Sequence, residues 1–231
     1  VRPGEKPEIA SLPLFRAMQE EQRERIFSGS FLQVFPPQLT LFELGQRPDF
    51  LHVLIDGLVE LSVSSAGRAT TMRIVEPVTS FILAAVVTDM PYLMSARTLA
   101  ASRILLVPAP LVREVVKEDA ALMQATMREL AMAYRNLVRA LTDMKLRQSA
   151  ERLGNLILEQ DHQQGATGNV HLRAEKRLIA SLLGMTPENL SRAFGALARH
   201  GATVDGSHIT IADRAALEEF ARPDPVPADD P

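Results

Sequence analysis

Residues 176–197 have the sequence KRLIASLLGMTPENLSRAFGAL, which predicts two short helices joined by a sharp turn. Ala180 on the first helix is small enough for the second helix to cross it closely, and Leu190 on the second packs back onto the first. Gly184 suits the positive φ that the turn requires. The spacing of these three residues indicates a helix-turn-helix. The alternative interpretation is an ordinary helical hairpin with a solvated, charged face.

The second helix of this pair has recognisable ends. Thr186 is a good N-cap, and Pro187 suits the first helical position. Gly201 follows the basic pair Arg199-His200 and suits the position just beyond the helix. The helix is therefore expected to span about residues 187–200.

The first two turns of this helix carry polar side chains of the kind that read DNA. A helix that enters the major groove presents this end to the base edges. Arg192 can form two hydrogen bonds with guanine, and Glu188 can accept one from cytosine N4. Residues 171–200 include five Lys or Arg and two Glu, which gives a local charge of +3. We predict that the following residues contact DNA: Thr186, Glu188, Asn189, Ser191, Arg192, Arg173 and Lys176.

The flanking sequence completes a domain over residues 148–222. An amphipathic helix is expected from about residue 149 to residue 160, followed by a glycine-containing loop. After the helix-turn-helix, Asp205-Gly206 predicts the tip of a β-hairpin, which would form a wing beside the helices. Residues 223–231 are rich in Pro and Asp and predict a disordered tail.

Residues 119–147 predict one long helix. The stretch from about Ala120 to Lys145 contains neither Gly nor Pro. Its apolar residues recur at alternating three- and four-residue steps, which is the seam along which two helices pack. We predict a dimer interface formed by the seam residues Met127, Leu130, Tyr134, Leu137, Leu141 and Met144. The alternative is a helix that packs along its own domain.

Residues 1–118 predict a domain of short strands, concentrated between Phe31 and Val107. The best of them, Leu51–Val63, alternates apolar and polar side chains, with Asp56-Gly57 as a turn or bulge. His52 lies on the polar side of this alternation, and we expect it to be exposed. Several short strands at this spacing favour a sandwich or a small barrel.

Residues 186–192 resemble the recognition helix of the CRP/FNR superfamily of transcription regulators. Glu188, Ser191 and Arg192 match the Glu-x-x-Ser-Arg pattern of its FNR and DNR branches, whereas Pro187 stands where the family often has Arg. The resemblance extends over nearly the whole chain. It implies an α+β fold with an N-terminal antiparallel β-roll (a cupin-like jelly roll), a long dimerisation helix and a C-terminal winged helix-turn-helix.

The same resemblance implies a function. The expected protein is an effector-controlled homodimer that binds a palindromic double-stranded DNA operator with FNR-like TTGAT half-sites. RNA polymerase is the further partner that this role implies. In helix-turn-helix dimers, the two-fold symmetry of the protein matches that of the operator.

Cyclic-nucleotide-binding members of the family hold the phosphate with the Arg of an Arg-Ser or Arg-Thr pair, and the ribose with the Glu of a Phe-x-Gly-Glu stretch. This chain has Phe81-Ile82-Leu83-Ala84 and Met94-Ser95 at the corresponding places. Because the Gly, the Glu and the Arg are missing, a nucleotide phosphate has no partner, and we predict that neither cAMP nor cGMP binds. Arg97, three residues further on, is the remaining candidate cation.

An apolar sensor pocket is the alternative to a nucleotide site. The sequence contains no Cys, which excludes a cysteine-held iron–sulfur cluster. Similarity to the DNR/NnrR group implies a response to nitric oxide or another redox or gas signal, with haem as the suggested cofactor. We predict an effector pocket formed by Phe81, Leu83, Val86, Tyr92 and Met94. None of the five His stands out as a haem ligand, so no metal ligand is assigned.

The composition limits other functions. The 231 residues are 46% hydrophobic and 23% charged, which is typical of a globular protein. The sequence shows no membrane-spanning apolar run and no signal peptide, so we expect a cytoplasmic protein without a membrane partner. It contains no nucleophile elbow, P-loop, dinucleotide-binding loop or His-Glu-x-x-His motif, and we expect no enzymatic activity. The alternative function is a ligand-binding regulatory subunit that acts through protein partners without binding DNA.

Overall fold

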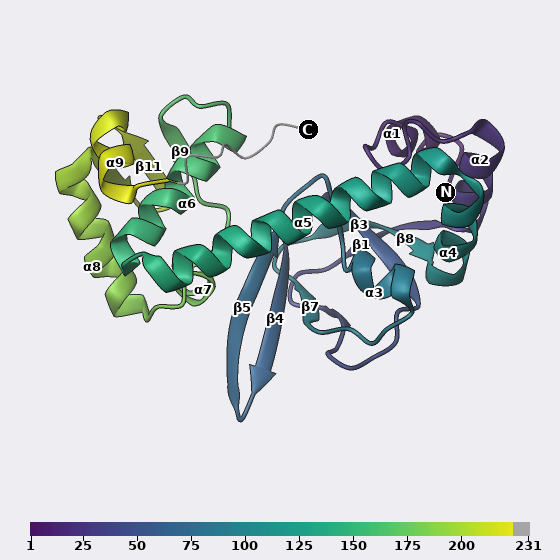
Figure 1. Ribbon diagram of the computed structural model, residues 1–231, viewed down its shortest axis with the longest axis horizontal. Coiled ribbons are helices and arrows are strands. Elements are labelled where there is room, and N and C mark those ends of the chain that lie inside the picture. Colours follow the sequence, from purple (N-terminus) through teal and green to yellow (C-terminus); the bar gives the residue numbers. More distant parts are fainter. Residues whose placement is uncertain (224–231) are drawn as a thin grey trace. The chain divides into compact units, whose positions relative to one another are not determined.

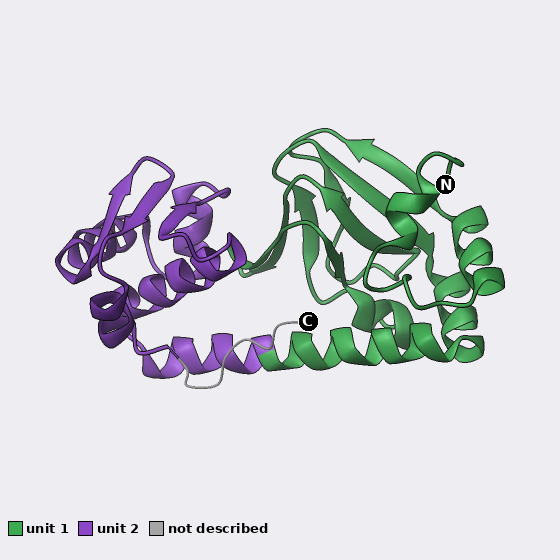
Figure 2. Cartoon of the chain, turned by 90° about the horizontal axis from the view of Figure 1, so that it is seen from above, with its two compact units in different colours: residues 1–135 green, residues 136–231 purple. Residues whose placement is uncertain are grey.

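The computed structural model describes residues 1–223 (Figure 1). The chain divides into two compact units, residues 1–135 and 136–231, and the boundary falls within one long helix (Figure 2). The tail predicted to be disordered lies, from residue 224 onward, outside the described residues. The division by role into residues 1–118, 119–147 and 148–222 remains a prediction, because the two units are defined by packing alone.

Two antiparallel four-stranded sheets form the first unit. One has the strand order β1–β8–β3–β6 and the other the order β2–β7–β4–β5. The strands are β1 Phe31–Phe35, β2 Thr40–Phe42, β3 Phe50–Asp56, β4 Val59–Ser65, β5 Arg68–Val75, β6 Thr79–Phe81, β7 Ser95–Thr98 and β8 Ser102–Pro108. Most neighbours in each sheet are distant in the sequence, as in a jelly roll, and the predicted β-roll is confirmed.

Strands β3 and β4 take the place of the single strand predicted over Leu51–Val63. Gly57, with a φ of +105°, separates them, and a Cβ atom there would lie 2.3 Å from the hydroxyl oxygen of Ser102. Only glycine therefore fits this close approach. The predicted interruption at Asp56-Gly57 is confirmed, but it moves the chain from one sheet to the other.

The expected exposure of His52 is wrong. Strand β3 lies between two cores, because Leu51 and Val53 pack with the helices while Leu54 packs between the sheets. Only 5% of His52 is exposed, and its ring centroid lies 5.2 Å from that of Phe42 and 5.3 Å from that of Phe81. Alternating polar and apolar residues predict an exposed face only for a strand that is covered on one side, and β3 is covered on both sides.

Helices cover one face of the β1–β8–β3–β6 sheet (Figure 1). They are α1 Lys6–Ala10, α2 Glu20–Gly29, α3 Leu83–Thr88 and α4 Ala109–Glu118. Phe27 of α2 and Val112 of α4 pack in one core with Leu51 and Val107 of the sheet. Pro110 lies in the first turn of α4, where its missing N–H costs no helical hydrogen bond.

Helix α5 (Ala120–Leu146) confirms the predicted long helix. Asp119 lies just before it and is fully buried. Its carboxylate accepts hydrogen bonds from the amides of Leu122, at 2.8 Å, and Gln19, at 2.9 Å. These bonds cap the start of α5 and attach it to the N-terminal segment. Within residues 1–223, no helix combines the length and apolar character needed to cross a bilayer.

The second unit combines helices with a small antiparallel sheet of strand order β10–β11–β9. After α5 its elements are α6 Ser149–Gln163, β9 Asn169–His171, α7 Lys176–Leu182, α8 Pro187–Leu197, the 3-10 helix η1 Ala198–His200, β10 Ala202–Asp205, β11 His208–Ile211 and α9 Arg214–Ala221. The predicted hairpin is confirmed, with Gly206-Ser207 between its strands. The sequence pattern did not reveal β9 or α9.

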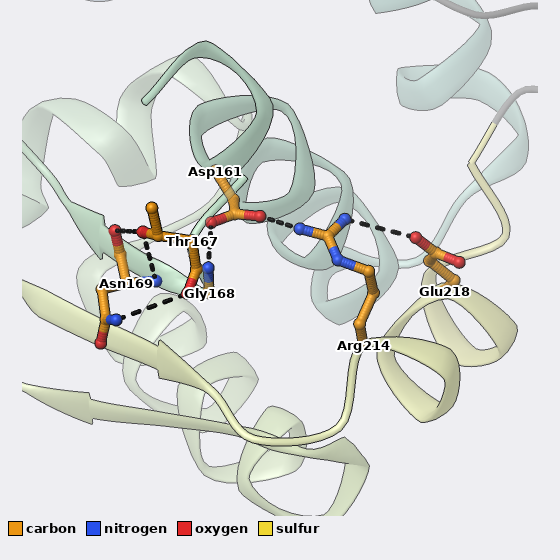
Figure 3. Close-up of polar contacts among 6 residues, drawn as sticks. All are labelled: Asp161, Thr167, Gly168, Asn169, Arg214 and Glu218. Carbon is orange, nitrogen blue, oxygen red and sulfur yellow. Dashed lines mark hydrogen bonds and ion pairs between the residues drawn. The ribbon is translucent and has the colours of Figure 1, made fainter. Parts of the chain in front are cut away.

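Asp161 joins three segments of this unit (Figure 3). It is fully buried near the end of α6, and its Oδ1 atom accepts a hydrogen bond of 2.8 Å from the amide of Gly168. Its Oδ2 atom pairs with Arg214 at the start of α9, which also pairs with Glu218 at 3.4 Å. One carboxylate therefore holds the loop before β9 and helix α9 to the end of α6.

Candidate nucleic-acid interface and sensor core

Helices α7 and α8 form the predicted helix-turn-helix. Ala180 and Leu190 are 1% and 2% exposed in the core of the second unit. Gly184 has a φ of +62°, and a Cβ atom there would lie 2.5 Å from Cε of Met144. The positive φ therefore favours glycine at the turn, and the end of the flexible Met144 side chain packs against it.

The start of α8 presents the polar residues that the sequence indicated. The Thr186 Oγ1 atom accepts a hydrogen bond of 3.2 Å from the amide of Asn189, which confirms the N-cap. A hydrogen bond with the Thr186 side chain lowers the pKa of the Glu188 carboxyl, and the charge of Arg192 lowers it further. The guanidinium of Arg192 donates to the Asn189 side-chain oxygen. Asn189 therefore orients Arg192 on the helix surface.

Two of the predicted DNA contacts precede α8. Arg173 lies in the loop after β9, and Lys176 is the first residue of α7; both are exposed. The Nζ atom of Lys176 lies 5.3 Å from the ring centroid of Phe194, which is within cation–π range. Thr186, Glu188, Ser191 and Arg192 are also exposed, while Asn189 is half-buried. Their contacts with DNA remain a prediction.

Two arginines connect the end of α5 to the other helices of the second unit. The Arg152 side chain donates to the carbonyl oxygens of Leu183, at 3.0 Å, and Arg147, at 2.8 Å. Arg147 pairs with Asp143 on α5 and donates to the carbonyl oxygen of Arg222 at the end of α9. These cations lie at helix C-termini, where the helix dipole favours positive charge. Sequence periodicity contains no sign of this role.

Most residues of the α5 seam are exposed to solvent. Met127, Tyr134, Leu137, Leu141 and Met144 are between 48% and 68% exposed. Leu130, the sixth seam residue, is half-buried against the core of the first unit. Apolar side chains exposed along one helix are typical of an interaction surface. The dimer interface itself remains a prediction.

The predicted effector pocket does not form one cluster. Phe81, Tyr92 and Met94 belong to the core between the sheets, whereas Leu83 and Val86 belong to the core beneath the helices. Phe81 and Tyr92 are 2% and 3% exposed, so the side chains of the chain itself fill this space. Their role in binding an effector stays a prediction.

Arg97 forms an ion pair with a residue of its own sheet. It lies opposite Glu60 on neighbouring strands, and the two side chains pair at 2.7 Å. The Glu60 side chain is 7% exposed and also accepts a hydrogen bond of 2.6 Å from the Thr71 hydroxyl. A ligand phosphate would have to compete with this buried carboxylate for Arg97.

A half-buried carboxylate on α5 contacts the sheet of the same unit. Glu129 accepts a hydrogen bond from the hydroxyl of Ser80, which precedes Phe81 on β6. Burial raises the pKa of the Glu129 carboxyl, and the bond from Ser80 and the charge of Arg73 partly offset this. The bond links α5 directly to the segment that leads into the predicted pocket.

Comparison with known families identifies both halves of this architecture. Residues 32–119 match the cyclic nucleotide-binding domain family, and residues 151–220 match the Crp-like helix-turn-helix domain family. The chain is a CRP/FNR-type transcription regulator. Regulators of the CRP/FNR type are not enzymes. None of the curated proteins matches the chain.

Solved structures with both halves of the CRP/FNR-type fold resemble the whole chain. A regulatory protein from Silicibacter pomeroyi DSS-3, named for cAMP binding, is 27% identical, with a TM-score of 0.61 over 95% of this chain and 99% of that one. FixK2 from Bradyrhizobium japonicum is 17% identical, with a TM-score of 0.75 over 83% and 96%. DNR from Pseudomonas aeruginosa is 21% identical, with a TM-score of 0.51 over 95% and 99%. The last two likenesses concern the fold alone.

Proposed function

We propose that this CRP/FNR-type regulator is a homodimer that reads a two-fold symmetric DNA site with helix α8 of each subunit. The observation that carries the proposal is the capped start of α8, which exposes Glu188, Ser191 and Arg192 within a Crp-like helix-turn-helix domain. The exposed seam of α5 supports the dimer. By resemblance, the operator is an FNR-like palindrome of TTGAT half-sites.

Each α8 side chain has a distinct role in this proposal. Arg192 bonds a guanine edge through two hydrogen bonds, and Asn189 holds its guanidinium in position. Glu188 accepts a hydrogen bond from cytosine N4 through its carboxylate. Arg173 and Lys176 contact phosphates. RNA polymerase is the further partner that a DNA-bound regulator implies.

We further propose that the effector is nitric oxide or another small redox or gas signal, and that it is not a cyclic nucleotide. The match to the cyclic nucleotide-binding domain covers residues 32–119, yet Ala84 and Met94 offer no ribose or phosphate partner there. Arg97 is paired with Glu60. The hydrogen bond between Ser80 and Glu129 connects α5 to β6, whose Phe81 lies in the core between the two sheets. An effector bound in this core acts through the Ser80–Glu129 bond and favours one of two packings of the dimer helix α5.

The core between the two sheets offers haem no open histidine in the conformation observed. Haem iron needs an axial ligand such as His, Met or Tyr. His52 is the only histidine in residues 1–135, and its Nδ1 atom has no hydrogen-bond partner within residues 1–223. However, its ring is packed between Phe42 and Phe81, so a macrocycle would reach it only after these rings moved. The proposed mechanism therefore contains no step through haem.

The alternative function, a regulatory subunit that acts through protein partners alone, is not favoured. The second unit matches a Crp-like helix-turn-helix domain, and the start of its α8 carries the side chains that bond bases. The two functions differ in their response to salt. DNA affinity that falls steeply as salt rises supports the DNA reader, because phosphate contacts release counterions.

Fluorescence anisotropy with a labelled TTGAT palindrome tests the role of α8. Arg192→Ala is expected to weaken specific binding by about 1–3 kcal/mol, roughly 5- to 150-fold. Lys117→Ala, which removes an exposed cation from α4, is the control and is expected to leave the affinity unchanged. Equal affinities of Arg192→Ala and the unmodified protein would show that α8 does not read the bases.

A further inference from the structure

His171 and His208 lie directly opposite each other on the neighbouring strands β9 and β11. Directly opposite residues of an antiparallel pair point to the same face of the sheet. Both side chains are exposed, and their ring centroids are 4.7 Å apart with an angle of 44° between the ring planes. The DNA-reading role proposed for α8 uses neither ring.

The distance between the two rings matches that of two imidazoles bound to one metal ion. Zn–N bonds are about 2.0–2.1 Å long, and ligand angles are about 90–110° in square-planar and tetrahedral sites. With these values, and with each ring centroid in line with its bond, the centroids of two imidazoles on one ion lie about 4.5–5.2 Å apart. The observed separation of 4.7 Å falls inside this range.

The surroundings hold His171 in place. The Gln164 side chain accepts a hydrogen bond of 2.8 Å from the His171 amide and donates one of 3.0 Å to the His171 carbonyl oxygen. The Ser207 hydroxyl oxygen lies 3.4 Å from Nδ1 of the His171 ring. This contact at Nδ1 helps to orient the His171 ring, as outer hydrogen bonds do for metal-binding histidines.

We infer that His171 and His208 form a two-histidine site for a divalent transition metal of the Zn²⁺, Ni²⁺ or Cu²⁺ class. Neutral imidazole is a preferred ligand of these ions. Water completes the coordination, because residues 1–223 contain no group of three or more His, Cys, Asp or Glu side chains that could hold a metal.

Isothermal titration calorimetry of the untagged full chain with NiCl₂ and ZnCl₂ tests the site. At pH 7.5 one ion is expected to bind per chain. His171→Ala and His208→Ala are each expected to weaken binding by at least about tenfold, because each removes one of two protein ligands. His162→Ala, which removes another exposed histidine of the same unit, is the control.

The titration distinguishes binding at the two histidines from binding elsewhere on the chain. Circular dichroism confirms that each variant is folded before titration. The inference is overturned if the unmodified chain binds neither ion, or if His171→Ala and His208→Ala keep the original affinity. A loss as large in His162→Ala also overturns it, because the ion would then bind at a different place. The titration uses free protein, so its result does not depend on whether the chain binds DNA.

Discussion

His52 is a buried base in the core between the two sheets of the first unit. Burial lowers the pKa of its imidazole to about 4, and the nearby Phe50 backbone only partly opposes this shift. In the unfolded chain the same imidazole titrates near its ordinary pKa of about 6.5. Between these two values the unfolded state binds a proton that the folded state does not. Acid therefore destabilises this unit through His52.

The stability of the chain is expected to fall with acid in a way that His52→Leu reduces. As the pH drops from about 6.5 to about 4, His52 removes up to roughly 3 kcal/mol from the free energy of unfolding. Urea unfolding at pH 7 and pH 4.5 measures this loss in the unmodified protein and in His52→Leu. If both proteins lose the same stability between the two pH values, the buried histidine is not responsible.

Asp161 is expected to contribute more to stability than the exposed Arg214–Glu218 pair does. Asp161→Ala removes a fully buried carboxylate and leaves the Gly168 amide without its acceptor, which costs about 2–4 kcal/mol. Glu218→Ala is the matched control, because it breaks the exposed Arg214–Glu218 pair at a cost within about 0.5 kcal/mol. Thermal unfolding compares the two variants. Similar melting temperatures would contradict the role assigned to Asp161.

Single-residue predictions failed where packing decides exposure. His52 was placed on a polar face because its neighbours alternate, but the second sheet covers that face. Arg97 was a candidate phosphate ligand until the structure placed it opposite Glu60 on a neighbouring strand. Strand pairing of residues that are distant in the sequence leaves no local signal. By contrast, the cap at Thr186 and the turn at Gly184 are local features, and both were predicted correctly.

At the scale of elements, long periodic segments were predicted best. Helix α5 spans 27 residues and has one repeating pattern, so its bounds were found to within a residue or two. Strand β9 has only 3 residues and takes its structure from its pairing with β11. Arg147, just after α5, and Arg152 on α6 donate to carbonyl oxygens at the ends of α9 and α7, which no sequence pattern reveals.

The exposed seam of α5 gives a prediction about assembly. Leu137→Asp places a charge at a residue that is 61% exposed in the single chain, so it should leave folding unchanged. In a dimer the same charge would be buried without a partner, which strongly weakens association. Sedimentation velocity is expected to show monomers for Leu137→Asp and dimers for Asn136→Asp, which adds the same charge away from the seam. Unchanged dimers in Leu137→Asp would place the interface elsewhere.

At the scale of the whole molecule, the sequence was enough to predict the order of parts. The β-roll, the long helix and the helix-turn-helix follow one another as the two domain matches require. The effector was not predictable in the same way, because the residues chosen for its pocket are divided between two cores. A local apolar run shows that a segment is buried, but it does not show which core the segment joins.

The selection of duplexes from a random DNA pool by the full chain tests the central proposal most directly. A homodimer that reads DNA with two α8 helices is expected to enrich an inverted repeat with half-site centres about 10–10.5 base pairs apart. The same selection with Arg192→Ala is expected to lose this enrichment or relax it at one position of each half-site. A pool with no inverted repeat, or an identical repeat selected by Arg192→Ala, would contradict the account.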